Sequence, residues 1–201
     1  MYDHQTDSLW VHTTGQAVTG PMRGNKLEFL PSTVTRWSAW RRDHPETKVL
    51  LGRRAGRFMG TFQAAGHLER FGVAIRPGPG DDQKATLYPY SLLRERGLLM
   101  DPEGPEPLVV VFDPDTVTAV VFAAEVDGKP LDLEPTEAED GARLMRDRAS
   151  GSVWTRDRGE CLDGPHKGRR LRQVAATPWL IERWRGFYPD GRLFALERRS
   201  D

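Results

Sequence analysis

The chain has 201 residues, of which 38% are hydrophobic, and its 29 basic and 29 acidic side chains give a formal net charge of +0. A balanced charge disfavours a protein that coats nucleic acid, so we expect no nucleic-acid partner. No run of about 18 apolar residues occurs, so no transmembrane segment is expected. The 15 prolines and 20 glycines indicate many turns, and hence short strands rather than long helices.

The first part of the chain predicts several short strands. Residues 1–13 alternate apolar and polar side chains around a polar turn, which is typical of a hairpin. Further strands are expected at 17–18, at 26–30 and at 48–51. Glycines between these strands mark tight turns.

A helix is expected between the last two of these strands. Ser32 or Thr33 can cap it, and it would run through Asp43. Trp37 and Trp40 are three positions apart, which places both on the inner face of the predicted helix.

The middle of the chain predicts a second set of elements. Residues 52–68 are rich in Gly and Arg without a clear period and are interpreted as a linker. Strands are expected at 71–75 and 85–88, and a helix at 90–96 that Gly97 ends.

Residues 108–112 form a continuous apolar run, which predicts a strand in the centre of its sheet. A turn follows at 113–115, and residues 117–126 run back. Asp127-Gly128 is a strong two-residue hairpin signal. The acidic segment 134–140 is expected to be a solvated loop.

The first fifty residues match a later part of the chain. With an offset of 144 positions, Met1–Leu50 aligns without a gap on Met145–Phe194, and thirteen of the fifty pairs are identical. Composition alone would give roughly three. We therefore predict an internal repeat, in which Thr177-Pro178 begins the second copy's helix.

These patterns predict a mainly β fold with a few short helices (α+β), built as a tandem repeat of a small β unit that carries one Trp-bearing helix. Residues 1–51 would be the C-terminal half of a first unit, 52–68 a linker and 69–196 a complete second unit. Because the chain opens inside the repeat without a signal peptide, we expect that an upstream part is missing.

The sequence also resembles a known family. The stretch from Met1 to Trp10, the Gly-Gln-Ala-Val-Thr-Gly-Pro loop from Gly15, and the Phe71-Gly72-Val73 strand resemble the bacterial and archaeal domain-of-unknown-function family 3179 (DUF3179). The aligned segment that begins at Met145 resembles this family as well.

The resemblance implies no established activity, but it suggests an exported or envelope-associated protein. Many members carry a Cys-Pro-Leu-Cys turn after the central strand, where a metal or redox role is the natural expectation. Here the matching turn is Asp113-Pro114-Asp115-Thr116, so both thiolate ligands are absent.

Asp113 and Asp115 remain candidate binding residues. They could offer two carboxylates to a hard cation such as calcium, or they could simply form an Asp-Pro turn. Cys161 could be a nucleophile with His166 nearby. However, its repeat counterpart is Ala17, which favours a small packed residue instead. No histidine pair has metal-ligand spacing, so we expect no metal and no cofactor.

Trp10, Trp40, Trp154 and Trp184 are candidates for lining a ligand groove, although recurrent tryptophans are typically core residues. His166 is a further candidate binding residue. Asp3 and Asp147 recur in both copies. They could be acid/base groups or acceptors of backbone hydrogen bonds in the hairpin turn.

We expect no catalytic residues, since no intact catalytic constellation is present. The predicted function is a non-catalytic binding or structural module of an envelope-associated protein, with a small-molecule or protein ligand. The alternative is a metal- or thiol-dependent enzyme whose active groups lie between the units or upstream of this chain.

Overall fold

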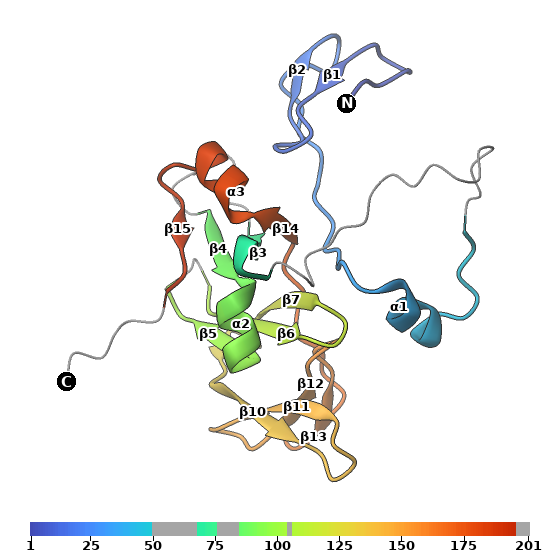
Figure 1. Cartoon of the computed structure of the whole chain (residues 1–201). Helices are drawn as coiled ribbons and strands as arrows, with labels where there is room; N and C mark the ends of the chain where they lie inside the picture. Colours follow the sequence, from blue (N-terminus) through green and yellow to red (C-terminus); the bar gives the residue numbers. More distant parts are fainter. Residues whose placement is uncertain (50–67, 76–84, 104–105, 196–201) are drawn as a thin grey trace. The chain divides into compact units, whose positions relative to one another are not determined.

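The computed structural model describes residues 1–49, 68–75, 85–103 and 106–195 (Figure 1). The chain divides into two compact units, Met1–Pro31 and Ser32–Asp201. Its described part is mainly β with three short α-helices, which confirms the predicted fold class. The predicted linker lies outside the described residues, apart from Leu68, and the predicted domain boundaries stay a prediction.

The first unit is a small hairpin structure. Strand β1 (Leu9–Trp10) pairs antiparallel with β2 (Ala17–Thr19), and Tyr2 bridges to Leu9. The strand predicted at 26–30 is wrong, because only one isolated bridge forms there, between Gln16 and Lys26. In the first unit no neighbouring strand extends that pairing.

The second unit is built around a three-stranded antiparallel sheet, in the order β5-β6-β7. The strands are β5 (Leu98–Asp101), β6 (Leu108–Asp113) and β7 (Thr118–Ala123). As predicted, β6 is central, and its side chains are buried on both faces of the sheet. Strand β5 was not predicted.

One face of this sheet packs against helix α2 (Tyr90–Arg96) and neighbouring strands. Val110, Phe112 and Val121 point to this side, where they meet Tyr90 and Leu93 of α2. The helix has the predicted bounds, and Gly97 ends it in the left-handed conformation with φ of 69°.

The other face packs against a four-stranded sheet in the order β10-β11-β12-β13. Its strands are β10 (Leu133–Glu137), β11 (Arg143–Asp147), β12 (Val153–Thr155) and β13 (Cys161–Asp163). Val109 and Phe122 meet Met145 and Trp154 in this second core. A short hairpin, β8 (Glu125–Val126) and β9 (Lys129–Pro130), leads into it around the predicted Asp127-Gly128 turn.

The acidic segment predicted as a loop is largely strand β10. Its residues pair along their length with β11, and Arg148 forms an ion pair with Glu134 at 2.8 Å. Pairing with β11, the next strand along the chain, therefore outweighs the weak local strand propensity of this segment.

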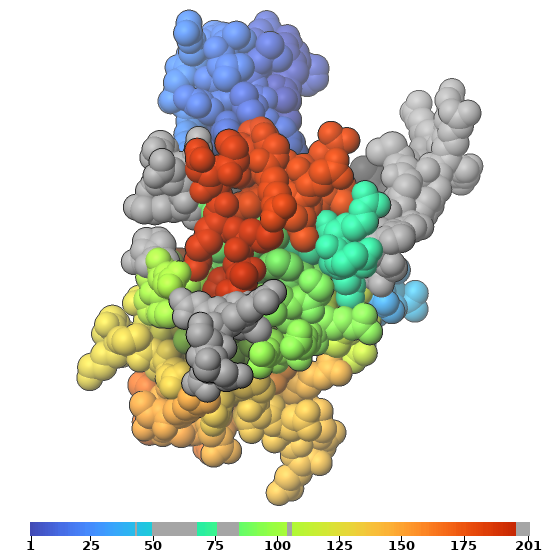
Figure 2. Space-filling model, turned by 60° about the vertical axis from the view of Figure 1, so that its left-hand side comes forward, coloured from blue at the N-terminus to red at the C-terminus, as the bar shows by residue number. Residues whose placement is uncertain are grey.

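A third sheet has the order β14-β3-β4-β15. It contains β14 (Ala176–Leu180), β3 (Phe71–Ile75), β4 (Thr86–Pro89) and β15 (Arg192–Leu193). Helix α3 (Ile181–Phe187) packs on it through buried Trp184. In Figure 2 the red C-terminal elements lie against green residues, and β15 pairs in parallel with β4.

The predicted start of this last helix is wrong. Thr177 and Pro178 belong to β14, where they pair with Ala74 and Val73 of β3. Proline is tolerated there because β14 is an edge strand. The helix begins only at Ile181.

Helix α1 (Trp37–Asp43) also begins later than predicted. Neither predicted cap, Ser32 or Thr33, is used, because the residue at the N-cap position is Arg36. Thr33 instead accepts a hydrogen bond from Gln173 at 3.1 Å. The expected inner face is wrong too, since Trp37 and Trp40 are 50% and 40% exposed.

The two segments aligned by the repeat have matching local structure. At the offset of 144 positions, β1 corresponds to β12, β2 to β13, and α1 to α3 with the same bounds. The strand pairs share one register, including an irregularity at the same place. Gly20 and Gly164 have φ of 86° and 92°. That the segments are copies of one unit stays a prediction.

Gly164 offers a test of the hairpin geometry. A Cβ atom there would lie 2.7 Å from Ser152 Cα, whereas a Cβ on Gly168, also at positive φ, would meet nothing within 4 Å. We expect Gly164→Ala to lower the free energy of unfolding by about 1–3 kcal/mol more than Gly168→Ala, since only the first adds a clash to backbone strain. Urea unfolding of both variants measures this, and equal losses would contradict it.

Candidate functional site

The turn between β6 and β7 is organised by Asp113. Its Oδ1 accepts a hydrogen bond from the Asp115 backbone N–H at 2.9 Å, and its Oδ2 accepts one from the Thr116 hydroxyl at 2.9 Å. Aspartate commonly closes a turn in this way, because its short side chain reaches the backbone two residues on.

Val117 holds a strained backbone conformation in the same turn. Its φ is 55°, in the left-handed region that β-branched residues rarely adopt. Its side chain is buried in the core with Phe112 and Ala119, so packing offsets the strain. The turn shape is therefore imposed by the core beneath it.

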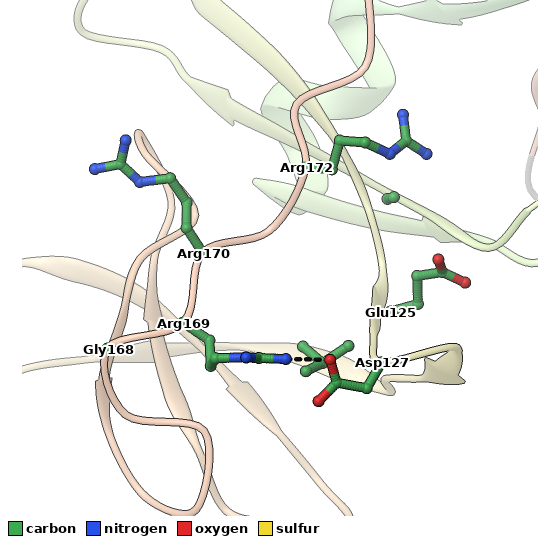
Figure 3. Close-up of a pocket in the computed structure, with 8 residues that line it drawn as sticks. Glu125, Asp127, Gly168, Arg169, Arg170 and Arg172 are labelled. Carbon is green, nitrogen blue, oxygen red and sulfur yellow. Dashed lines mark hydrogen bonds and ion pairs between the residues drawn. The ribbon is translucent and has the colours of Figure 1, made fainter.

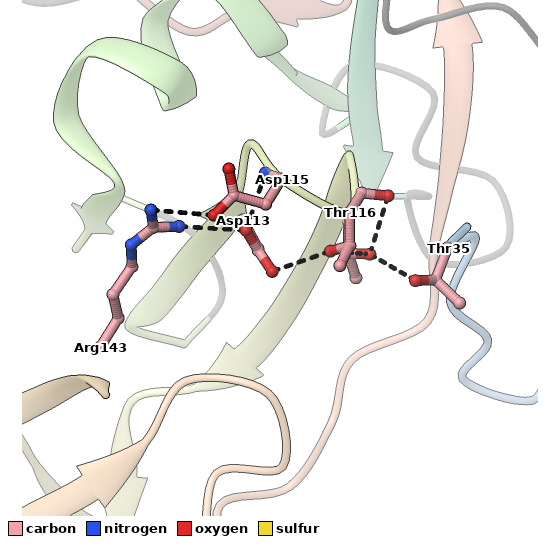
Figure 4. Close-up of polar contacts among 6 residues, drawn as sticks. Thr35, Asp113, Asp115, Thr116 and Arg143 are labelled. Atoms are coloured by element: carbon pink, nitrogen blue, oxygen red, sulfur yellow. Dashed lines mark hydrogen bonds and ion pairs between the residues drawn. The ribbon is translucent and has the colours of Figure 1, made fainter. Parts of the chain in front are cut away.

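Arg143 from β11 joins the two carboxylates of the turn. Its Nη1 lies 3.1 Å from Asp113 Oδ1, and its Nη2 lies 3.1 Å from Asp115 Oδ2 (Figure 4). A planar guanidinium is suited to such a fork. Both predicted site residues are thus brought together, and each is already neutralised by a fixed cation.

A line of hydroxyl groups continues from the turn. The hydroxyl oxygens of Thr116 and Thr118 lie 2.8 Å apart, and those of Thr118 and Thr35 lie 2.8 Å apart as well (Figure 4). Sequence reasoning missed Thr35 and Arg143, because each is distant from the turn in sequence and neither belongs to a motif.

Arg156 was also missed, and it lies partly buried near this turn. Its Nε donates to the Leu144 carbonyl at 2.9 Å. Burial, followed by repulsion from Arg143, lowers the pKa of Arg156 from its usual value. The two guanidinium groups make this end of the sheet positively charged. That charge favours the ionised carboxylates of Asp113 and Asp115, with which Arg143 pairs.

The predicted aromatic residues lie in different surroundings. Trp154 is fully buried in the second core, and the His166 ring lies 6.0 Å from its ring. Trp10 is half-buried in the first unit. A binding role for Trp10, Trp154 or His166 stays a prediction, although the burial of Trp154 leaves its ring no open groove to line.

Cys161 is buried, and its thiol lies 3.2 Å from the Asp163 carbonyl, which accepts its weak hydrogen bond. Burial raises the pKa of the thiol. A nucleophilic cysteine needs a lowered pKa and access to substrate, so Cys161 has the environment of a packed core residue.

Asp147 is committed to the hairpin turn. Its Oδ2 accepts hydrogen bonds from the Ser150 backbone N–H at 2.8 Å and hydroxyl at 2.6 Å, and Oδ1 accepts one from Asp132 N–H at 2.9 Å. Burial alone would raise the pKa of Asp147, but these hydrogen bonds lower it overall. Asp3 accepts equivalent bonds from Gln5 and Thr6.

An open pocket of about 390 Å³ is lined by basic and acidic side chains (Figure 3). Arg169 is paired with Asp127, Arg170 with Glu160, and Arg172 with Glu106. Each of these three arginines is therefore neutralised by a carboxylate of its own. The expected absence of a nucleic-acid partner stays a prediction.

A second pocket, of about 290 Å³, lies beside a buried carboxylate. Asp101 accepts a hydrogen bond from Tyr88 Oη at 2.5 Å and pairs with Arg192. Burial, together with the Asp101 hydrogen bond, raises the pKa of Tyr88, so its hydroxyl stays protonated. This cluster ties β15 to β5, since Arg192 and Asp101 come from those strands.

In the described part of the chain, no three His, Cys, Asp or Glu side chains are grouped as a metal site would require. None of the described helices is long and apolar enough to cross a membrane.

A family model described as a protein of unknown function, DUF3179, matches residues 1–68 and 80–201. The chain belongs to this family. The match confirms the resemblance seen in the sequence. No curated protein and no solved structure matches the chain.

In this DUF3179 chain the residues of the β6–β7 turn do not fit a thiolate-bound metal. The turn offers two carboxylates rather than two sulfurs, and both are paired with Arg143. A cation there would have to displace a guanidinium from the fork. The turn of this DUF3179 chain is therefore closed by the hydrogen bonds of Asp113, and Arg143 neutralises its two carboxylates.

Asp113 and Asp115 are expected to differ in their contribution to stability. Asp113→Ala removes two hydrogen bonds within the turn as well as an ion pair, so we expect a loss of about 1–2 kcal/mol. Asp115→Ala removes only an exposed ion pair, with an expected loss below about 0.5 kcal/mol. Urea denaturation of both variants tests this; a larger loss for Asp115→Ala would refute it.

Asp147 is expected to make the fold sensitive to acid. Because its pKa is lowered in the folded state, it stabilises the fold above the ordinary aspartate pKa, and this contribution is lost as pH falls through the folded-state value. We expect Asp147→Asn to cost about 1–3 kcal/mol at neutral pH. Below about pH 4 the wild type should lose stability more steeply than the variant, as thermal melts across pH would reveal. Parallel pH profiles would contradict this role.

Proposed function

We propose that this chain is a non-catalytic binding module of an envelope-associated protein, and that its ligand is another protein. One observation carries the proposal. Seven of the thirteen exposed large apolar side chains in the described part belong to the first unit, residues 1–31. They are Met1, Tyr2, Leu9, Val18, Leu27, Phe29 and Leu30. Such a concentration is typical of a surface that another macromolecule covers.

A small-molecule ligand has less support. The pocket beside Arg169 is open and lined mainly by charged side chains, and the one beside Asp101 is open as well, whereas small-molecule sites are typically enclosed. The alternative of a metal- or thiol-dependent enzyme has no specific observation in its favour among the described residues. The envelope setting rests on the family resemblance alone, and fractionation of cells that produce the protein tests it.

Cross-linking in cells tests the protein ligand. A photoreactive phenylalanine analogue placed at Leu27 should give a discrete adduct with another protein, because Leu27 is exposed within the apolar surface. The same analogue at Val18 is the control. Val18 is also exposed, but its counterpart in the second segment, Leu162, is exposed as well, so neither position needs a cover.

The proposal would be abandoned if Leu27 gave no adduct, or if both positions gave the same diffuse products. Western blots of purified tagged protein before and after illumination provide the readout.

A further inference from the structure

The open pocket of about 390 Å³ has a basic wall and an acidic wall. Arg169, Arg170 and Arg172 supply the basic wall from one stretch of chain. Glu125 and Asp127 supply the acidic wall from the β8–β9 hairpin, on the other side of the pocket (Figure 3). The guanidinium groups that line this pocket therefore outnumber its carboxylates.

The local backbone does not require two of these arginines. At the offset of 144 positions, the counterparts of Arg169 and Arg172 are Asn25 and Glu28. The backbone is nevertheless alike, because the carbonyls of Asn25 and Arg169 each accept a hydrogen bond at 2.9 Å, from β2 and β13 respectively. The shape of the turn therefore does not explain the positive charge at positions 169 and 172.

The ion pairs of the three arginines are exposed and leave donors unused. The side chains of Arg169, Arg170 and Arg172 are 53%, 62% and 61% exposed. Each pair joins one Nη2 atom to one carboxylate oxygen, whereas a guanidinium group has five N–H donors. Because exposed ion pairs contribute little free energy, an anion that accepts hydrogen bonds from several of these donors can compete with the carboxylates.

Glu125 adds a hydrogen-bond acceptor to the pocket. It is half-buried. Among the residues that the structure describes, none forms an ion pair or a hydrogen bond with its carboxylate. A carboxylate that has lost part of its hydration without gaining a donor favours a ligand that brings one. The pocket therefore suits an anion that can also donate a hydrogen bond.

Hydrogen phosphate is an anion of this kind. Its unprotonated oxygens accept charge-assisted hydrogen bonds from guanidinium groups, and its P–OH group can donate one to a carboxylate. Sulfate has a similar shape and the same charge but no proton to donate. A phosphate monoester has lost its last P–OH proton at about pH 8, because its second ionisation lies near pH 6.

We propose that this pocket is a binding site for inorganic phosphate. Arg169 and Arg172 donate hydrogen bonds to the phosphate oxygens, Arg170 adds positive charge, and Glu125 accepts the P–OH hydrogen. Asp127 competes with the ligand, since it already pairs with Arg169. Charge-assisted hydrogen bonds hold the anion, so the site does not need the apolar enclosure that other small molecules require. The site is independent of the apolar surface of the first unit.

Isothermal titration calorimetry on the full chain tests the proposal. Inorganic phosphate, sulfate and glycerol 3-phosphate are each titrated at about pH 8 and at one ionic strength, because salt screens exposed charges. We expect inorganic phosphate to bind at least tenfold more tightly than the other two anions. The proposal fails if inorganic phosphate gives no saturable binding, or if all three anions bind equally.

A double variant locates the binding to the arginines. Arg169→Asn with Arg172→Glu introduces the residues that the first unit carries on the same backbone, so we expect it to fold. It should weaken phosphate binding at least tenfold. The control is Arg94→Gln, since Arg94 is exposed on α2 and does not line the pocket; it should change the affinity less than twofold. Equal affinities for the double variant and the control would overturn the proposal.

Two single variants on the acidic wall keep the test decisive if the double variant does not fold. Asp127→Asn removes the competing carboxylate, and asparagine tolerates the φ of 51° at this position, so phosphate should bind at least twofold more tightly. Glu125→Gln introduces an amide that can donate to sulfate, so the preference for phosphate over sulfate should disappear. Weaker binding by Asp127→Asn, or an unchanged preference in Glu125→Gln, would contradict the proposed roles.

Discussion

Burial of β6 on both of its faces is the constraint on which the second unit depends. Val110 and Phe112 point into one core with α2, while Val109 and Val111 point into the other with β12. A strand buried on both faces needs a layer on each side. Helix α2 with β3 and β4 supplies one layer, and the hairpin sheet β10–β13 supplies the other.

The hairpin sheet has a local structure that does not depend on that burial. The first unit has the same strand register and the same positive φ at its glycines, although Met1 and Leu27 are exposed. Its turns and short-range hydrogen bonds, such as those to Asp3, are enough to define the backbone. What differs between the segments is the surface against which the apolar face packs.

The β6–β7 turn keeps its shape at a position where the family resemblance suggests cysteines. Asp113 closes the turn through hydrogen bonds, and Arg143 neutralises it together with Asp115. The strain at Val117 is offset by the burial of its side chain in the core. The turn therefore keeps its shape through packing and electrostatics, without a thiol.

The sequence by itself determined the elements whose signals are local. The apolar run of β6, the bounds of α2 with its terminal Gly97, and the Asp127-Gly128 hairpin all follow from propensity and turn chemistry. The turn at Asp113 and Asp115, with its two carboxylates, also follows from the sequence.

Only the tertiary structure decided the features that depend on distant partners. Arg143 reaches the turn because β11 lies near it, and Pro178 extends an edge strand because β3 is beside it. The same holds for Trp40 and Trp184, which share one position on matching helices. Trp184 is buried because Leu87 and Ala74 of the third sheet cover it, whereas Trp40 remains 40% exposed. Whether a side chain is buried depends on the residues that pack against it, and a local sequence pattern does not include those residues.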